Sequence, residues 1–345
     1  MVNITRRAAT VGLGATALVG LTGRKSRAAE QVVVYTVIPE TEINRQINEE
    51  FTKQTGIEVT LLVIPAVGTA ASRIRSEKDN PRADIFAAAP VDFQEALAAE
   101  DLLVPYNSPL VTPEMLDMGF ADPKGFWTGW YAQTTCIFWN TDRFNKDFAS
   151  KGIAAPQTWD DLLKPEYAGE IVTSDTRTSS MGVTLLCTQI FRSDEEKAWE
   201  FIRGLNKNIK LYTPAATMTV TLVERGESTF GIFYLGDVLA AKLDRKQPID
   251  FVVPQDNIAN VWTASIIKGG PNTEAAKKYI DFLQSTYPQE INAKLGYRYP
   301  LNPEAKSVEG APKLSDIKLV HYDNAFVSAN LDRLRKRWAT ETGQG

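Results

Sequence analysis

The residues best suited to do chemistry in this chain are the hydroxyl groups gathered between positions 174 and 180. Five of these seven residues are serine or threonine: Ser174, Thr176, Thr178, Ser179 and Ser180. They precede an apolar helix predicted over 181–191, and free amides at the start of a helix attract an anion. Arg177 could bind an oxyanion through two parallel N–H groups, with a solvated or structural role as the alternative. The sequence therefore predicts an oxyanion site formed by Arg177, Thr178, Ser179 and Ser180. The alternative is an ordinary helix cap, for which one hydroxyl group is sufficient.

Three further loops follow predicted strands, at the end where ligands of parallel sheets bind. Their candidate ligand-binding residues are Thr36 and Thr41 in the first loop, Ala89 in the second, and Tyr234 and Asp237 in the third. A structural role explains each loop equally well. The first loop could simply lead into a helix, the second could allow tight packing, and the third could supply a helix cap.

The elements that must position these loops alternate between strand and helix in the first part of the chain. We expect strands at 32–35, 57–64 and 83–86, and helices at 42–55, 69–78 and 91–99. Continuous apolar strands joined by amphipathic helices predict a mostly parallel sheet with helices on both faces. The fold class is therefore α/β.

A second α/β unit follows, with strands at 169–173 and 230–234 and helices at 181–191, 198–205, 220–225 and 237–243. Crossings near 130–138 and 262–267 would join the two units and leave a cleft between them. We expect lobe 1 to hold residues 29–130 and 265–345, and lobe 2 to hold residues 131–264. The tail over 317–338 is predicted to be largely helical. One large sheet with insertions is the alternative.

The first residues have the pattern of an export signal. Arg6 and Arg7 precede a weak apolar run that ends at Leu21, and small residues surround Ala28. This pattern predicts a twin-arginine signal peptide over residues 1–28, cleaved near Ala28, and a periplasmic protein that is not inserted in the membrane. An arginine pair beside a buried helix is the alternative.

Charge and motifs exclude several classes of function. Without residues 1–28 the chain holds 33 basic and 42 acidic residues, a net charge of −9, which argues against nucleic acid as partner. The sequence contains no nucleophile elbow, phosphate-binding P-loop or zinc-protease motif, and we expect neither an enzyme nor a cofactor. Cys136 and Cys187 could be two buried thiols or one disulfide.

Several short segments, in this order over residues 30–340, are similar to the periplasmic solute-binding proteins of ABC importers. The segments are FTKQTGIEV at 51–59, ADIF at 83–86, GFWTG at 125–129, TWDDLLKPEYAG at 158–169 and SIIKGGPN at 265–272. The resemblance implies the type II architecture of two lobes with two hinge crossings and a cleft between the lobes. It also implies a monomer that closes on a small anionic solute and delivers it to an ABC permease and its ATPase.

The same resemblance gives two candidate cargoes. Arg177, Thr178 and Ser180 match the Arg-Ser-Gly-Thr loop of phosphonate and organophosphate binders, with Ser179 in place of the glycine. A phosphonate or phosphate ester is therefore the first candidate, and Asp237 or Glu40 could hold an ammonium group of such a ligand.

Ferric iron is the second candidate cargo. Iron binders of this family place two adjacent tyrosines after the matching strand, where this chain has Phe233 and Tyr234. The ligands that remain for iron are Tyr234, Tyr131, Glu40 and Asp237. A third alternative is a subunit that presents its ligand to a sensor kinase.

Overall fold

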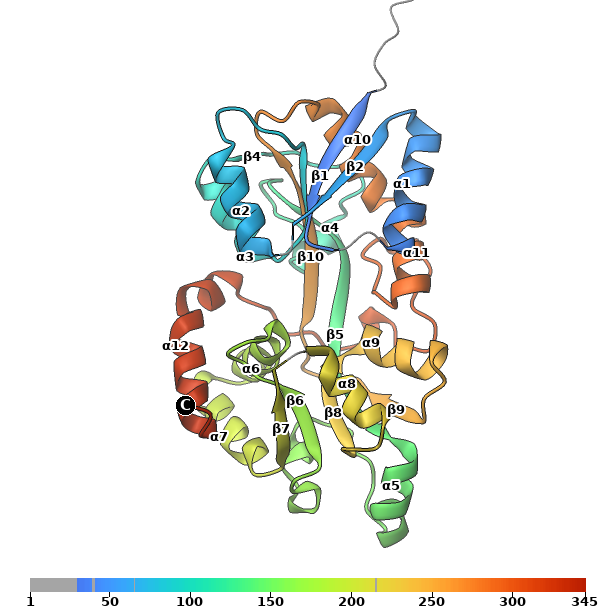
Figure 1. Cartoon of the computed structure of the whole chain (residues 1–345), viewed down its shortest axis with the longest axis vertical. Helices are drawn as coiled ribbons and strands as arrows, with labels where there is room; N and C mark the ends of the chain where they lie inside the picture. The colour runs from blue at the N-terminus through green and yellow to red at the C-terminus, as the bar shows by residue number, and fades with distance from the viewer. Residues whose placement is uncertain (1–29, 39–40, 65, 215) are drawn as a thin grey trace, which may run out of the picture.

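The computed structural model describes residues 30–38, 41–64, 66–214 and 216–345. The predicted signal peptide and Glu40 lie outside the described residues. Figure 1 shows an elongated molecule made of two bodies, one above the other, with two long strands running between them.

The strands are β1 (Gln31–Thr36), β2 (Glu58–Val63), β3 (Ile85–Ala89), β4 (Leu103–Val104), β5 (Thr128–Asn140), β6 (Ile171–Ser174), β7 (Ile209–Thr213), β8 (Phe230–Tyr234), β9 (Ile249–Val252) and β10 (Ala259–Ile267). The helices are α1 (Glu42–Thr55), α2 (Val67–Ser76), α3 (Val91–Ala99), α4 (Pro113–Asp117), α5 (Thr141–Asp147), α6 (Ser180–Arg192), α7 (Glu195–Asn206), α8 (Ala216–Glu224), α9 (Leu235–Leu239), α10 (Thr273–Gln284), α11 (Thr286–Gly296) and α12 (Asn324–Thr342).

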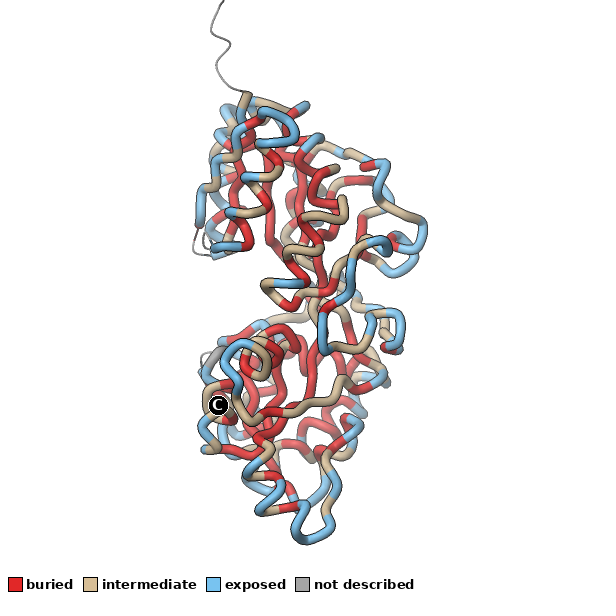
Figure 2. Tube along the Cα trace, turned by 90° about the vertical axis from the view of Figure 1, so that its right-hand side faces the viewer, coloured by how far each residue is buried: buried red, intermediate tan, exposed pale blue. Residues whose placement is uncertain are grey.

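The strands form one curled mixed sheet in the order β2-β1-β3-β10-β5-β8-β6-β7, with β4 beside β10 and β9 beside β5. At one end β1 runs parallel to β2 and β3, and at the other end β6 runs parallel to β7 and β8. The long antiparallel pair β5 and β10 joins the two parallel groups. The predicted crossings near 130–138 and 262–267 are these two strands, and they pass through the narrow waist seen in Figure 2.

The first body has an apolar layer on each face of its sheet. Val32 and Val34 of β1 belong to one cluster, with Phe51 of α1, and Val33 and Tyr35 belong to the other. This alternation follows from the strand period of two residues, and each buried side chain of this size contributes about 2 kcal/mol of apolar burial. Helices α1, α10 and α11 cover the first face, and α2 and α3 cover the second.

The second body is built around β6, β8 and the lower half of β5, with α6, α8 and α9 packed on the sheet and α7 packed on α6. Its apolar cluster also includes Leu334 and Trp338 of α12, and α12 packs along α7. The lobe boundaries expected from the sequence stay a prediction, but the C-terminal helix contributes its apolar face to this second body.

The tail departs from the predicted helix over 317–338. Residues 317–323 are extended in part, because Asn257 exchanges backbone hydrogen bonds with Lys318 and Val320. The helix begins only at Asn324, where the carboxylate of Asp323 accepts a hydrogen bond of 2.8 Å from the amide of Phe326. The segment therefore runs beside the hinge before it turns into α12.

In the described part of the chain, no helix combines the length and the apolar character needed to cross a membrane. Cys136 and Cys187 are both buried free thiols, so the disulfide alternative is not the arrangement found.

Candidate solute-binding cleft

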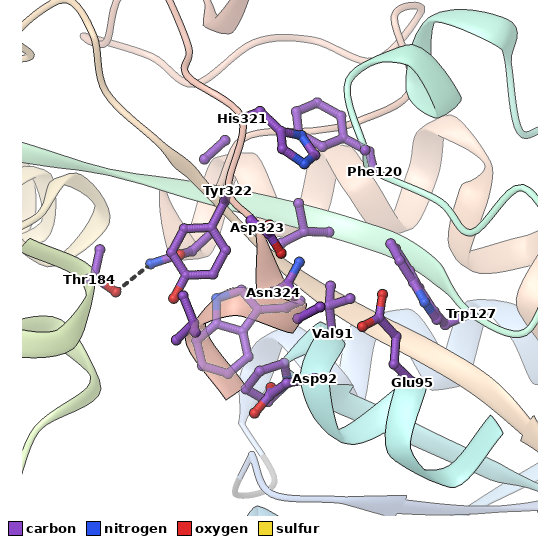
Figure 3. Close-up of a pocket in the computed structure, with 18 of the residues that line it drawn as sticks. Val91, Asp92, Glu95, Phe120, Trp127, Thr184, His321, Tyr322, Asp323 and Asn324 are labelled. Atoms are coloured by element: carbon purple, nitrogen blue, oxygen red, sulfur yellow. Dashed lines mark hydrogen bonds between the residues drawn. The ribbon is translucent and has the colours of Figure 1, made fainter. Parts of the chain in front are cut away.

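A cavity of about 540 Å³ lies where the two bodies meet. The first body lines it with the start of α3 and the loop before β5, and the second with the first turns of α6 and the end of β8. The hinge strand β10 and the segment from Leu319 into α12 complete the wall. Figure 3 shows side chains from these elements, including Asp92, Thr184 and Tyr322, gathered around one space.

Four polar side chains from three elements meet on the second-body side of this cavity. The amide of Asn260 on β10 donates hydrogen bonds to Thr184 Oγ1 at 2.9 Å and to Tyr234 Oη at 3.1 Å. The two hydroxyl oxygens of Thr184 and Tyr234 are themselves 3.1 Å apart. Ser180 lies one helical turn before Thr184, and its side chain also interacts with Tyr234. We call Ser180, Thr184, Tyr234 and Asn260 the polar node.

The phenol of Tyr234 is protonated in this setting. Burial raises the pKa of Tyr234 above its ordinary value of 10.0, although hydrogen bonds from its neighbours in the polar node oppose that shift. Tyr234 therefore enters the node as a neutral hydroxyl group at physiological pH.

The loop before α6 is held tightly against the helix. Ser179 caps the helix by accepting a hydrogen bond of 3.2 Å from the amide of Met181. A Cβ atom at Gly182 would lie 2.6 Å from the Cα of Thr176, so only glycine permits this approach. Thr178 donates to the carbonyl oxygen of Pro214 at 3.1 Å. Of the hydroxyl residues predicted to bind ligand here, Ser180 lines the cavity, whereas Thr178 and Ser179 have partners within the protein.

The guanidinium of Arg177 faces the carboxylate of Asp175 and not the cavity. Its guanidinium pairs with Asp175, with 2.6 Å between Nη2 and Oδ2, and it also donates to the carbonyl oxygen of Gln344. The ring of Trp338 lies 5.9 Å from the guanidinium carbon. These contacts hold the C-terminal end of the chain and leave Arg177 outside the residues that line the cavity.

The predicted residues of the first body, Thr36, Thr41 and Ala89, do not line the cavity. Thr36 is buried and accepts a hydrogen bond of 3.2 Å from the amide of Ile38. Thr41 is exposed, and no hydrogen bond of its side chain caps α1. Ala89 is fully buried, and its carbonyl oxygen accepts from Thr263 at 2.7 Å. The residues directly after it, Pro90 and Val91, are the ones that reach the cavity.

The described residues named for iron, Tyr131, Tyr234 and Asp237, do not line the cavity together. Tyr131 is buried beside Trp262 and under the guanidinium of Arg298, whose carbon lies 4.5 Å from the ring centroid. Burial raises the pKa of Tyr131 to about 12. Asp237 is half-buried in α9 and does not line the cavity, so of these three described residues Tyr234 alone does. The described residues contain no group of three or more histidine, cysteine, aspartate or glutamate side chains that could hold a metal.

The opposite wall of the cavity is acidic. Asp92 and Glu95 lie one turn apart at the start of α3 and both line the cavity. Burial raises the pKa of the Asp92 carboxyl. The pKa of Glu95 is raised by burial and by the nearby negative charges of Asp122, Asp92 and Asp323. Among the described residues, neither Asp92 nor Glu95 forms an ion pair within 4.0 Å, so this wall favours a positively charged group.

Sequence reasoning missed two members of the polar node. Thr184 follows Ser180 by four residues, which places both on one face of a helix, and this spacing was the available signal. Asn260 gave no signal, because a single asparagine at the start of a predicted strand is typical of a loop end.

Comparison with solved structures supports the fold. The periplasmic binding protein AfuA from Actinobacillus pleuropneumoniae, solved with exogenous fructose-6-phosphate bound, has a TM-score of 0.71 and 27% sequence identity, and the match covers 92% of this chain and 100% of that chain. The molecule thus has the architecture of a type II periplasmic binding protein, as the resemblance implied.

Residues 80–327 match the family of bacterial extracellular solute-binding proteins, and the chain belongs to this family. Iron uptake protein A1 of Synechocystis sp. is 24% identical over 275 residues, which cover 75% of this chain and 72% of that protein. The putative 2-aminoethylphosphonate-binding periplasmic protein of Salmonella typhimurium is 23% identical over 313 residues, covering 85% and 86%. The protein is a solute-binding protein of the ABC importer class.

Proposed function

We propose that this protein captures a small solute with an oxyanion group, an organophosphonate or a phosphate ester, in the periplasm. It then delivers the solute to an ABC permease and its ATPase. The observation that carries this proposal is the polar node, which presents hydroxyl groups from α6 and β8, oriented by an amide group on β10, to the cavity.

The number of amide and hydroxyl hydrogens in the polar node explains why it can bind a hydrogen-bond acceptor of a ligand. Asn260 donates its two amide hydrogens to Thr184 and Tyr234. Each hydroxyl has one hydrogen, and only one of the two can lie between the oxygens of Thr184 and Tyr234. The other hydroxyl hydrogen is available to a ligand oxygen, and the Ser180 hydroxyl, which interacts with Tyr234, also lines the cavity. A neutral hydroxyl cluster beside the start of α6 supports binding of an anion.

Two relatives support the same ligand class. AfuA was solved with fructose-6-phosphate, and the Salmonella protein is named for 2-aminoethylphosphonate. Both ligands carry a tetrahedral oxyanion, and the second also carries an ammonium group, which would suit the acidic wall at Asp92 and Glu95.

Isothermal titration calorimetry with the purified protein tests this proposal. The panel holds fructose 6-phosphate, 2-aminoethylphosphonate, methylphosphonate and inorganic phosphate, with fructose as the uncharged control. We expect micromolar or tighter binding of at least one oxyanion and none of fructose. Absence of binding across the panel would overturn the proposal. Small-angle scattering should show a smaller radius of gyration with ligand, since the two bodies close on it.

Ferric iron is the second candidate, favoured by the likeness to Iron uptake protein A1 and by the presence of Tyr234 at the cavity. Ferric citrate loading should then give a visible tyrosinate absorption band that Tyr234→Phe abolishes. A colourless protein after loading counts against iron. The neighbouring genes separate transport from the sensing alternative, because a kinase gene in place of a permease gene favours a sensor.

We also propose export by the twin-arginine route, cleavage near Ala28 and a monomeric state. Arg6→Lys with Arg7→Lys should keep the protein in the cytoplasm, and the first residue of the exported form should be Ala29. Light scattering of the exported form should give the mass of one chain.

A further inference from the structure

We infer that Arg335, on the C-terminal helix α12, is the cation that holds the oxyanion of the solute. This inference rests on the proposed function and assigns to Arg335 the role that was predicted for Arg177. Arg335 lines the cavity together with Val327 and Leu331, which precede it at intervals of four residues on the same face of α12.

The guanidinium of Arg335 is oriented but not neutralised. Its Nε donates to the carbonyl oxygen of Thr176 at 3.3 Å, in the loop that leads into α6. Within the described parts of the chain, neither Nη atom has a recorded hydrogen-bond or ion-pair partner. Two parallel N–H groups with no acceptor are the arrangement that binds a phosphate or phosphonate group bidentately.

The other arginines of this helix are occupied. Arg333 pairs with Glu195 at 2.5 Å, and Arg337 pairs with Glu196 at 2.8 Å and stacks on the ring of Trp199. These side chains lie along α7, away from the cavity. The half-buried Arg335 thus differs from Arg333 and Arg337 in two ways: it lies on the face of α12 that lines the cavity, and its guanidinium has no carboxylate partner among the described residues.

The position of Arg335 fits the remaining donors. Thr176, which accepts from Arg335, touches Gly182 in the first turn of α6, so the guanidinium lies beside the amide end of that helix. Ser180 in the same turn lines the cavity, as do Arg335 and the rest of the polar node. An oxyanion bound in this cavity could therefore meet both a full positive charge and hydroxyl donors.

The test compares Arg335→Gln and Arg335→Lys with the matched control Arg337→Gln, two residues further along the same helix. Fructose 6-phosphate, methylphosphonate and inorganic phosphate are the probes, measured by calorimetry on the full mature protein. We expect Arg335→Gln to weaken binding of the bound oxyanion about 10- to 100-fold, the loss typical of a charge-assisted hydrogen bond. Arg335→Lys should keep part of the affinity, and Arg337→Gln should bind like the parent protein.

Chemical rescue separates a direct contact from a structural effect. Guanidinium at millimolar concentration should restore binding to Arg335→Ala and leave the parent unchanged, whereas a misfolded variant gains nothing. Thermal unfolding of each variant is recorded in parallel. Unchanged affinity in Arg335→Gln while the parent binds would overturn this inference and leave the proposed function standing. Failure of the parent to bind any probe would overturn both.

Discussion

Asn260 on the hinge strand donates a hydrogen bond of 3.1 Å to the phenolic oxygen of Tyr234 at the end of β8. The same amide group holds Thr184 on α6, at 2.9 Å. One side chain on a strand that joins the two bodies therefore orients two candidate ligand donors of the second body. A substitution at Asn260 should act on binding through both of them.

We predict that Asn260→Leu weakens oxyanion binding about tenfold or more, because two hydroxyl groups lose the donor that orients them. Tyr234→Phe alone should have an effect of similar size. The double variant should lose less than the sum of the two single losses, since the residues act as one unit. Calorimetric dissociation constants for the four proteins complete the cycle, and strictly additive losses would contradict a shared node.

Ser180, the first residue of α6, and Thr178, in the loop before it, form a matched pair. Ser180→Ala should lower oxyanion affinity about 3- to 30-fold, because a cavity-lining donor is lost. Thr178→Ala should change affinity less than twofold, because this hydroxyl is bonded to the carbonyl oxygen of Pro214. Equal effects from both variants would show that the closed form uses the loop differently.

Local patterns in the sequence were sufficient to predict most elements of the fold. Helix 42–55 and strand 230–234 are found with the predicted bounds, because amphipathic spacing, apolar runs and the glycine at 56 act within a few residues. The site was harder. Ser180 and Tyr234 were found by their place at element ends, but Arg335 is one of five charged residues between positions 332 and 337, and nothing in the sequence separates it from its solvated neighbours. Only long-range packing of α12 along α7 shows which charge faces inward.

Gly182→Ala should destabilise the protein and weaken binding together. The added methyl group would meet the backbone of Thr176 at 2.6 Å and that of Asp175 at 2.8 Å, and neither atom can rotate away. Overpacking of this kind costs about 1–3 kcal/mol of unfolding free energy. Urea denaturation measures that loss. Gly204→Ala is the control, because its new methyl group would meet only the flexible side chain of Leu163, at 3.1 Å.

The carboxyl group of Asp161 should make the free energy of unfolding depend on pH in the acidic range. Burial would raise its pKa, but hydrogen bonds from Lys164 and from the amides of Gln157 and Thr158 outweigh burial and lower the pKa. A carboxyl group whose pKa is lower in the folded than in the unfolded protein stabilises the fold at every pH above its unfolded-state pKa, which is near 4. This contribution is lost as the pH falls below that value.

Asp161→Asn should therefore reduce the free energy of unfolding by about 1 kcal/mol or more at pH 7. The difference from the parent should shrink between pH 4 and pH 3. The neighbouring Asp160→Asn is the control, because its carboxylate is exposed and pairs with Arg192 at the surface. A difference that stays constant with pH would show that Asp161 does not act through its charge.

Asp92→Asn should change which solute is preferred. Removal of an unpaired carboxylate from the cavity wall should raise the affinity for ethylphosphonate several-fold, since charge repulsion is relieved. The affinity for 2-aminoethylphosphonate should fall if its ammonium lies at this wall. Competition titrations of the two ligands, which differ by the amino group, give the ratio directly. Equal changes for both ligands would place the ammonium elsewhere.

The course of α12 has a consequence for synthesis of the protein. The wall of the cavity around Arg335 comes from residues that the ribosome adds after both bodies of the sheet are complete. The strands can thus be complete before this wall of the cavity exists. We expect a chain clipped before Asn324 to bind more weakly than Arg335→Gln, because it also lacks Leu334 and Trp338 in the core of the second body.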